Sequence, residues 1–300
     1  MPEGQLAATL CLPSGGAADT VLVLMSGSNY NGTYWDFQYA PETYNFRRAM
    51  NRAGLATIVV DRLGNGNSTQ PPALSLTATA TAQALHAIVG SLRAGLAGAP
   101  PFAKVITVGH SLSSGTSVME ASANHDVDGV ILTGYSHALN IPETIGVIST
   151  YQRAVDDPQF AGRTTDPGYL VSRPGTRIHD FYDPADVDPA VLAQDEQTKE
   201  QFSLSEYPDG LTSTLPGMSS FITAPVLLVN GSRDRLSCGP NYSVCADSAT
   251  LRAQEAPYFS PAARLQAFVL PGSGHAVNLA RNTQDYQNAV IDWVRSTIGS

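Results

Sequence analysis

The sequence has few charged residues and no long apolar run. Charged residues make up 14% of the 300 residues and apolar residues 43%, whereas soluble domains usually carry about 25% charged residues. This composition excludes intrinsic disorder, because disordered chains are rich in charge and poor in apolar residues. Apolar runs such as 21–25 and 226–229 are short, and a membrane helix needs about 20 apolar residues. We therefore expect a folded chain without a transmembrane segment, in one large domain or two small ones.

Positive charge is scarcer than negative charge. The chain has 17 lysines and arginines against 26 aspartates and glutamates, a net charge of −9. The only lysines are Lys104 and Lys199, and no basic cluster occurs. Since nucleic acids and anionic membranes attract basic surfaces, we expect neither as a partner.

Cysteine is also rare, which excludes a disulfide-dense scaffold. Cys238 and Cys245 are close enough in sequence to close a small loop, but three reduced thiols, with Cys11 as the third, remain the alternative. No zinc-type spacing of cysteine and histidine is present, so no metal site is expected.

Residues 1–5 lack the basic and apolar regions of a signal peptide. The two lysines, the low charge and the possible bridge favour an extracellular protein, with a cytoplasmic one as the alternative.

Short apolar runs alternate with longer helical patterns along the chain. Strands are predicted at 6–12, 21–25, 56–61, 104–109, 127–133, 225–230 and 266–270, and helices at 45–53, 74–97, 113–124 and 285–298. Strands that are apolar on both faces and separated by helices are typical of a parallel sheet covered on both sides. The predicted fold class is therefore α/β, with a mostly parallel central sheet and helices on both faces. In such sheets ligands bind where the strands end.

Residues 135–221 break this alternation. The segment has no strong apolar strand and is rich in aspartate, proline and tyrosine. A structureless loop of this length is uncommon in a compact domain, and 142–155 and 190–202 could each form a helix. We interpret 135–221 as an inserted, mainly helical cap over a core domain made of 1–134 and 222–300.

A nucleophile elbow is predicted after the strand at 104–109. Ser111 is the centre of Gly109-His-Ser-Leu-Ser113, close to the pattern G-x-S-x-G with serine as the last residue. Small neighbours let a strand turn sharply into a helix, so that the serine hydroxyl stands above the sheet. The first N–H groups of that helix then point toward a developing oxyanion.

A base and an acid are predicted at two other strand ends. His275 follows the last strand on a glycine-containing loop, and Asp234 follows the strand at 225–230. A serine hydroxyl needs a base to remove its proton, and the base needs a carboxylate to fix its tautomer. Asp247 and Asp128 are the alternatives for the acid.

The order Ser111, Asp234, His275 resembles that of the α/β-hydrolase superfamily, and the resemblance covers nearly the whole chain. The stretch 61–68, DRLGNGNS, is similar to the superfamily's D-x-R-G-x-G-x-S loop, slipped by one position. Ser26-Gly-Ser28 stands where the superfamily usually has His-Gly-x. The resemblance implies that the backbone N–H groups of Ser28 and Leu112 form the oxyanion hole, and that the insertion at 135–221 is the cap.

These residues predict acyl transfer by a serine hydrolase without metal or organic cofactor. Ser111 attacks a carbonyl, His275 moves the proton, and water releases the acid from an acyl-enzyme. A thioesterase, an amidase or peptidase, and an acyltransferase could use the same residues, and a non-enzymatic ligand receptor on this fold is a further alternative. The oligomeric state is not readable from the sequence.

Aromatic residues near the predicted site favour a hydrophobic acyl or aromatic ester, or a lactone, as the small-molecule substrate. Seven aromatic residues crowd positions 30–46, just after the oxyanion strand. We expect about half of them to build core and the rest to line an apolar pocket. The residues predicted to contact substrate are Tyr30, Tyr34, Trp35, His110 and His137.

Overall fold

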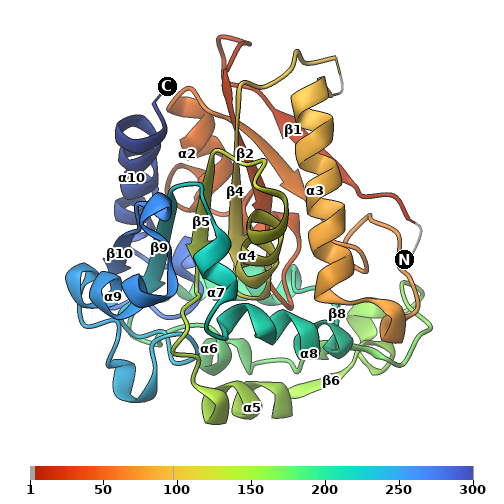
Figure 1. The fold of residues 1–300 in the computed structure, drawn as a ribbon. Coiled ribbons are helices and arrows are strands. Elements are labelled where there is room, and N and C mark those ends of the chain that lie inside the picture. The colour runs from red at the N-terminus through yellow and green to blue at the C-terminus, as the bar shows by residue number, and fades with distance from the viewer. Residues whose placement is uncertain (1–3, 97, 300) are drawn as a thin grey trace.

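A seven-stranded sheet forms the centre of the molecule (Figure 1). The computed structural model describes residues 4–96 and 98–299. The strand order is β1-β3-β2-β4-β5-β9-β10. These strands are β1 (Ala8–Cys11), β2 (Thr20–Met25), β3 (Ala56–Val60), β4 (Lys104–His110), β5 (Gly129–Thr133), β9 (Val226–Gly231) and β10 (Gln266–Leu270). Every pair is parallel except β1 with β3, which confirms the predicted fold class.

Two helical layers cover the two faces of this sheet. Helices α2 (Phe46–Arg52) and α10 (Thr283–Trp293) lie on one face, packed on Leu22 and Leu24 of β2. Helices α3 (Ala78–Ala94), α4 (Leu112–Asn124) and α9 (Ser248–Glu255) lie on the other, packed on Val21 and Val23. Successive strand residues point to opposite faces, so a strand between two helical layers must be apolar on both. This explains the continuous apolar runs in the sequence.

Several predicted boundaries differ from the observed ones. Helix α3 begins after Thr77, whose side chain caps the first turn by accepting from Ala80 N, and residues 73–75 form a separate 3-10 turn. The predicted end of this helix at Ala97 lies outside the described residues, as do 1–3 and 300 at the ends of the predicted core domain. The final predicted helix continues beyond α10 as a π-helical turn, Val294–Ile298. Helix α9 and the short α1 (Pro41–Tyr44) were not predicted.

The segment 135–221 lies between β5 and β9 and adds no strand to the central sheet. Its helices are α5 (Ile141–Ser149), α6 (Arg177–Asp180), α7 (Pro189–Gln197) and α8 (Tyr207–Gly210). It also holds an antiparallel sheet of β6 (Tyr151–Arg153), β7 (Tyr169–Ser172) and β8 (Phe202–Ser203), which the sequence analysis did not predict. The helix expected at 142–155 ends at Ser149, shortly before β6, and the helix expected at 190–202 ends at Gln197, before β8. In Figure 1 these elements lie together below the central sheet.

No helix among the described residues is both long enough and apolar enough to cross a lipid bilayer.

Candidate active site

Ser111 occupies a strained turn between β4 and α4. Its φ is +54° and its ψ −122°, a conformation that costs energy for any residue with a side chain. A Cβ on Gly109 would lie 2.4 Å from Ser113 O and 2.5 Å from Ser114 N, so only glycine fits two positions before the serine. Ser113, at the position where the pattern has glycine, donates its hydroxyl proton to Ser26 O at 2.6 Å. Serine fits there because its hydroxyl ties the elbow to the neighbouring loop.

The loop 26–28 lies directly against the elbow. A Cβ on Gly27 would lie 2.8 Å from both His110 O and the Cβ of Ser111, so this close approach also requires glycine. Among residues 4–96 and 98–299, the backbone N–H groups of Ser28 and Leu112 have no protein acceptor. Two free donors beside a strained serine are the arrangement that an oxyanion hole needs.

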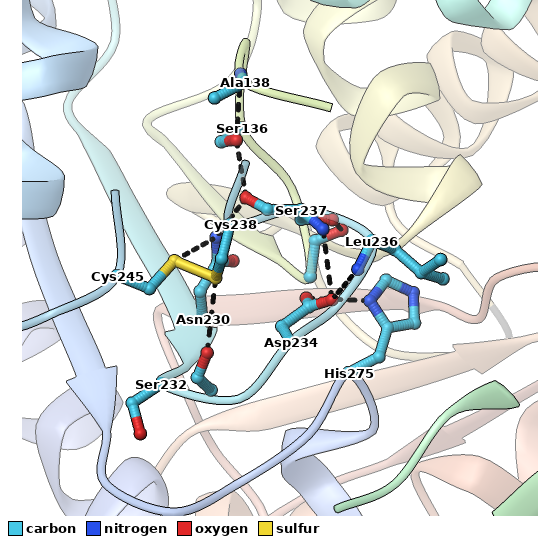
Figure 2. Close-up of a disulfide and its surroundings, with 12 residues drawn as sticks. Ser136, Ala138, Asn230, Ser232, Asp234, Leu236, Ser237, Cys238, Cys245 and His275 are labelled. Atoms are coloured by element: carbon cyan, nitrogen blue, oxygen red, sulfur yellow. Dashed lines mark hydrogen bonds and ion pairs between the residues drawn. A yellow bond between two sulfur atoms is a disulfide. The ribbon is translucent and has the colours of Figure 1, made fainter. Parts of the chain in front are cut away.

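Asp234 and His275 form a buried hydrogen-bonded pair at the ends of β9 and β10 (Figure 2). His275 Nδ1 lies 2.8 Å from Asp234 Oδ2. The other carboxylate oxygen accepts from Leu236 N at 2.9 Å and Ser237 N at 3.1 Å. The aspartate is 0% exposed and the histidine 3%. Because the carboxylate accepts, Nδ1 carries the proton and Nε2 holds the lone pair that a general base needs.

Gly134 fixes the space that His275 occupies, and the sequence analysis missed it. It follows β5 with a φ of +61°, and a Cβ there would lie 2.8 Å from His275 Cε1. A side chain at this position would push the imidazole away. The positive φ requirement is not visible in a sequence, but a glycine directly after an apolar strand was a usable signal.

Two cavities flank Ser111 and His275. The first has a volume of about 70 Å³, and its walls include Gly134, Leu139 and Leu211. The second, of about 20 Å³, lies on the side of Ser28 and Tyr30. Residues common to both are Ser111, Thr144, Tyr207, Leu236 and His275. His275 Nε2 is buried without a hydrogen-bond partner, so no bond to Ser111 Oγ is closed. Such bonds are often long in unliganded enzymes and tighten with substrate.

Of the five residues predicted to contact substrate, the structure places two at these cavities. Tyr30 and His110 line the second cavity. The Tyr34 ring stacks on the His110 ring with centroids 4.5 Å apart. Trp35 packs between Tyr34 and Phe46. These two are core residues, since both side chains are buried in the cluster between the sheet and helices α2 and α10.

His137 also lies away from both cavities. Its Nδ1 is 2.6 Å from Glu255 Oε2 and its Nε2 is 3.0 Å from Ser219 Oγ. Both ring nitrogens are thus occupied by the protein. The prediction of a substrate contact at His137 is not supported by its position.

His110 is a neutral, fully buried neighbour of the candidate base. The hydroxyl of Thr133 donates to Gly109 O, so His110 Nδ1 donates to Thr133 Oγ1 at 3.1 Å. Burial, together with the nearby His275, holds the pKa of His110 well below its usual value. An uncharged ring here leaves the Asp234 carboxylate as the ionic partner of any imidazolium formed at His275.

Tyr207 of α8 is a wall residue that the sequence analysis missed. Its hydroxyl lies 3.1 Å from Ser28 Oγ, and its ring lines both cavities. The preceding residue, Glu206, forms a fully buried ion pair with Arg62 at 2.7 Å. Arg62 Nη2 also donates to Gly27 O at 3.4 Å. The 135–221 segment is therefore tied to the loop that carries one of the two candidate oxyanion donors, Ser28 N–H.

The loop after Asp234 is closed by a disulfide between Cys238 and Cys245 (Figure 2). Of the two readings left open by the sequence, the structure has the bridge, and Cys11 is free. Asn230 Nδ2 lies 3.4 Å from Ser237 O and 3.7 Å from Cys245 Sγ. The bridge therefore holds the segment whose N–H groups orient Asp234.

The two alternative acids lie elsewhere. Asp247 caps α9 by accepting from Thr250 N. Asp128 pairs with Arg93 and accepts from Val105 N. Neither contacts His275.

The sequence profile described as "Alpha/beta hydrolase family" matches residues 22–286. Since this is most of the chain, the protein belongs to that family. No curated protein matches the sequence closely enough to count as a relative.

Many solved structures share the fold. An esterase from Thermogutta terrifontis, solved with malate bound, superposes with a TM-score of 0.62 at 18% identity, over 99% of this chain and 95% of that chain. An enol-lactonase from Burkholderia xenovorans LB400 gives 0.62 at 17% identity, over 98% and 97%. A monoacylglycerol lipase from Paleococcus ferrophilus gives 0.60 at 17% identity, over 98% and 99%. At these identities the likeness concerns the fold.

Proposed function

We propose that the protein is a serine hydrolase that cleaves a small apolar carboxylic ester or lactone through Ser111, His275 and Asp234. The observation that carries the proposal is the unpartnered Nε2 of His275, buried at the wall of the same cavity as Ser111, while Nδ1 is held by Asp234. A histidine oriented in this way has its basic nitrogen available only to the serine and to whatever enters the cavity.

The proposed reaction has two steps through an acyl-enzyme. His275 Nε2 takes the Ser111 hydroxyl proton as Oγ attacks the substrate carbonyl carbon, and the N–H groups of Ser28 and Leu112 stabilise the oxyanion. The carbon–oxygen bond to the leaving alcohol then breaks, and His275 returns the proton to that alcohol. Water attacks the acyl-enzyme by the same route, which restores Ser111 and releases the acid.

The cavity walls favour a small and apolar acyl group. A volume of about 70 Å³ is far below the 300–1,000 Å³ of pockets for drug-sized ligands. Several hydroxyls at its walls are turned onto the backbone: Ser136 donates to Ser237 O, Ser237 to Gly134 O, and Ser213 to Gly210 O. Their protons are therefore not available to substrate, and the remaining surface is mostly carbon. The esterase and enol-lactonase among the structures of the same fold support the choice of an ester or lactone.

A series of p-nitrophenyl esters from acetate to dodecanoate, with Ser111→Ala as the blank, tests this function. We expect multiple turnovers on acetate to butyrate, little on octanoate and longer chains, and none in the blank. Turnover that survives Ser111→Ala contradicts the mechanism. If no ester is hydrolysed by folded protein, a thioester and an anilide series test the thioesterase and amidase alternatives, and stoichiometric binding without turnover indicates a receptor.

We also propose that the protein works in an oxidising, extracellular compartment. The Cys238–Cys245 disulfide supports this, because such bonds persist outside the reducing cytosol;. Titration of the unreduced, denatured protein purified from its source should find one free thiol, and three would contradict the proposal.

A further inference from the structure

One histidine and two carboxylates come together at helices α3 and α4 and the loop before β5. They are His86, Glu120 and Asp126, each with one nitrogen or oxygen atom within 4.8 Å of the others. His86 Nδ1 lies 2.8 Å from Asp126 Oδ2 and 3.5 Å from Glu120 Oε1. From this geometry we propose that the three side chains form a binding site for a divalent metal ion, with Zn²⁺ as the preferred ion.

The carboxylates are short of positive charge and of hydrogen bonds. Glu120 is 1% exposed, its Oε2 has no hydrogen-bond partner, and Asp126 Oδ1 is likewise buried and unpartnered. The other neighbours of the Glu120 carboxylate are Asn124 Nδ2, 3.3 Å from Oε1, and the Asp126 carboxyl group, which brings no positive charge. Among the described residues no lysine or arginine lies within ion-pair distance of either carboxylate. A buried carboxylate without such compensation is costly.

The other buried glutamates of the described chain are compensated. Glu206 pairs with Arg62, Glu200 with Arg163, and Glu255 with His137 through a short hydrogen bond. Among the described residues, Glu120 approaches one ionisable nitrogen, His86 Nδ1, at the longer distance of 3.5 Å. A divalent cation between the three side chains would supply the missing charge.

The distances suit zinc. Zinc binds imidazole and carboxylate at about 2.0–2.2 Å, which places tetrahedral ligand atoms about 3.4 Å apart. The two His86 separations, 2.8 and 3.5 Å, lie on either side of this value, and all three ligand atoms are within 4.8 Å of one another. His86 is half exposed, so its ring can adjust. An open cavity of about 370 Å³, lined by His86, Glu120 and Asn124 among others, leaves room for a water as the fourth ligand.

The expected role of this ion is to stabilise the fold. His86 lies on α3, Glu120 on α4 and Asp126 just after α4, so one ion would join two helices and the start of a central strand. Glu120 is nine residues along the helix from Ser111, roughly 13 Å away at 1.5 Å per residue. The site is therefore separate from the candidate nucleophile.

Titration of metal-free protein with ZnCl₂, followed by calorimetry and by thermal unfolding, tests the proposal. We expect one Zn²⁺ per chain at this site, and a rise in Tm of about 5 °C at a hundredfold excess over Kd. CaCl₂ should bind more weakly, because calcium prefers oxygen ligands. Neither readout depends on catalytic activity, so failure of this proposal leaves the proposed function standing, and the reverse is also true.

Single substitutions at the proposed ligands and at two other histidines test whether the ion binds at this cluster. His86→Ala and Glu120→Gln should each weaken binding at least tenfold, since even outer contacts of a metal site are worth 10–100-fold. His179→Ala, which removes an exposed histidine elsewhere, and His275→Ala should leave binding unchanged. If Glu120→Gln fails to fold, the half-exposed His86→Ala alone decides. No binding, or binding lost in His275→Ala but kept in His86→Ala, overturns the proposal.

Discussion

Two buried histidine–carboxylate pairs occur among the described residues, and their hydrogen bonds are nearly the same. His275 Nδ1 lies 2.8 Å from Asp234 Oδ2, and His137 Nδ1 lies 2.6 Å from Glu255 Oε2. The second pair even has a serine, since Ser219 Oγ is 3.0 Å from His137 Nε2. By hydrogen-bond geometry alone, Ser219, His137 and Glu255 look more like a complete catalytic triad than the candidate site does.

The difference lies in what surrounds each pair. Tyr258 stacks on the His137 ring with centroids 4.0 Å apart, and neither cavity beside Ser111 reaches it. Ser219 lies within a 3-10 turn, Met218–Phe221, with its hydroxyl already bound. Ser111 instead stands on a strained turn, between two cavities and beside two free N–H groups. Open space and unused donors, more than the hydrogen-bonded array, mark a site that can react.

The largest expected effect is the difference in kcat between variants of the two serines, Ser111 and Ser219. Ser111→Ala should lower kcat on the best p-nitrophenyl ester by about 10⁵–10⁶. Ser219→Ala should leave kcat within a few-fold and lower the free energy of unfolding by about 1 kcal/mol, the value of a typical hydrogen bond. Loss of activity in the Ser219 variant, with Ser111→Ala still active, would reverse the assignment.

Substitutions of the two paired carboxylates, Asp234 and Glu255, should also differ in their effect on kcat. Asp234→Asn should reduce kcat by about 10⁴, because an amide oriented toward Nδ1 favours the wrong imidazole tautomer. Glu255→Gln should affect stability and leave kcat nearly unchanged, as should Asp247→Asn. A silent Asp234→Asn combined with an inactive Asp247→Asn would show that the acid is Asp247.

Removing the disulfide beside Asp234 should lower the stability of the protein. The bridged cysteines are seven residues apart, and closing a loop of this size stabilises by about 2.4 kcal/mol in the chain-entropy account. We expect the double variant Cys238→Ser, Cys245→Ser to lose about that much in urea unfolding. Cys11→Ser, which changes the free cysteine, is the matched control and should be neutral. Equal stability of all three proteins would mean that the bridge adds nothing.

His110 should make stability depend on pH. Its pKa in the folded protein is well below the usual value, whereas the unfolded chain binds a proton near pH 6.5. The unfolded state therefore holds more protons at low pH, and the free energy of unfolding should fall by up to about 1.4 kcal/mol per pH unit below 6.5. His110→Gln should flatten this slope between pH 6.5 and 5. An unchanged slope would mean that His110 does not titrate on unfolding.

The smallest expected effect is on kcat/KM, when the hydroxyl of Tyr207 is removed. Tyr207→Phe removes the hydroxyl near Ser28 Oγ and should lower kcat/KM about fivefold, equivalent to about 1 kcal/mol. The fold should be unaffected. Tyr258→Phe makes the same change beside His137 and should have no effect on turnover. Equal kcat/KM in both variants would show that the Tyr207 hydroxyl does not position the oxyanion loop.

The fold was predictable because its signal is local. A strand between two helical layers must be apolar on both faces, and this pattern is visible in runs such as 21–25 and 226–229. The sheet of β6, β7 and β8 was not predictable in the same way. Its strands are two to four residues long, too short for a recognisable period, and they form only because the segment folds on itself.

The candidate site was partly predictable for a related reason. Parallel strands end at one edge of the sheet, so Ser111, Asp234 and His275, each following a strand, had to lie near one another. Tyr207 gave no such signal, because its place depends on the Arg62–Glu206 ion pair that joins distant parts of the chain. For His137, the same strand-end argument brought it near the site but could not show which way the ring turns.

The sequence alone therefore determined the fold class and the three residues of the proposed mechanism, since both follow from strand pattern and strand ends. The tertiary structure decided which histidine keeps a free nitrogen, which aromatic residues line a cavity and how small that cavity is. It also brought together His86, Glu120 and Asp126. These properties depend on contacts between segments far apart in the chain, and on whether a neighbouring side chain fills the space or leaves it open.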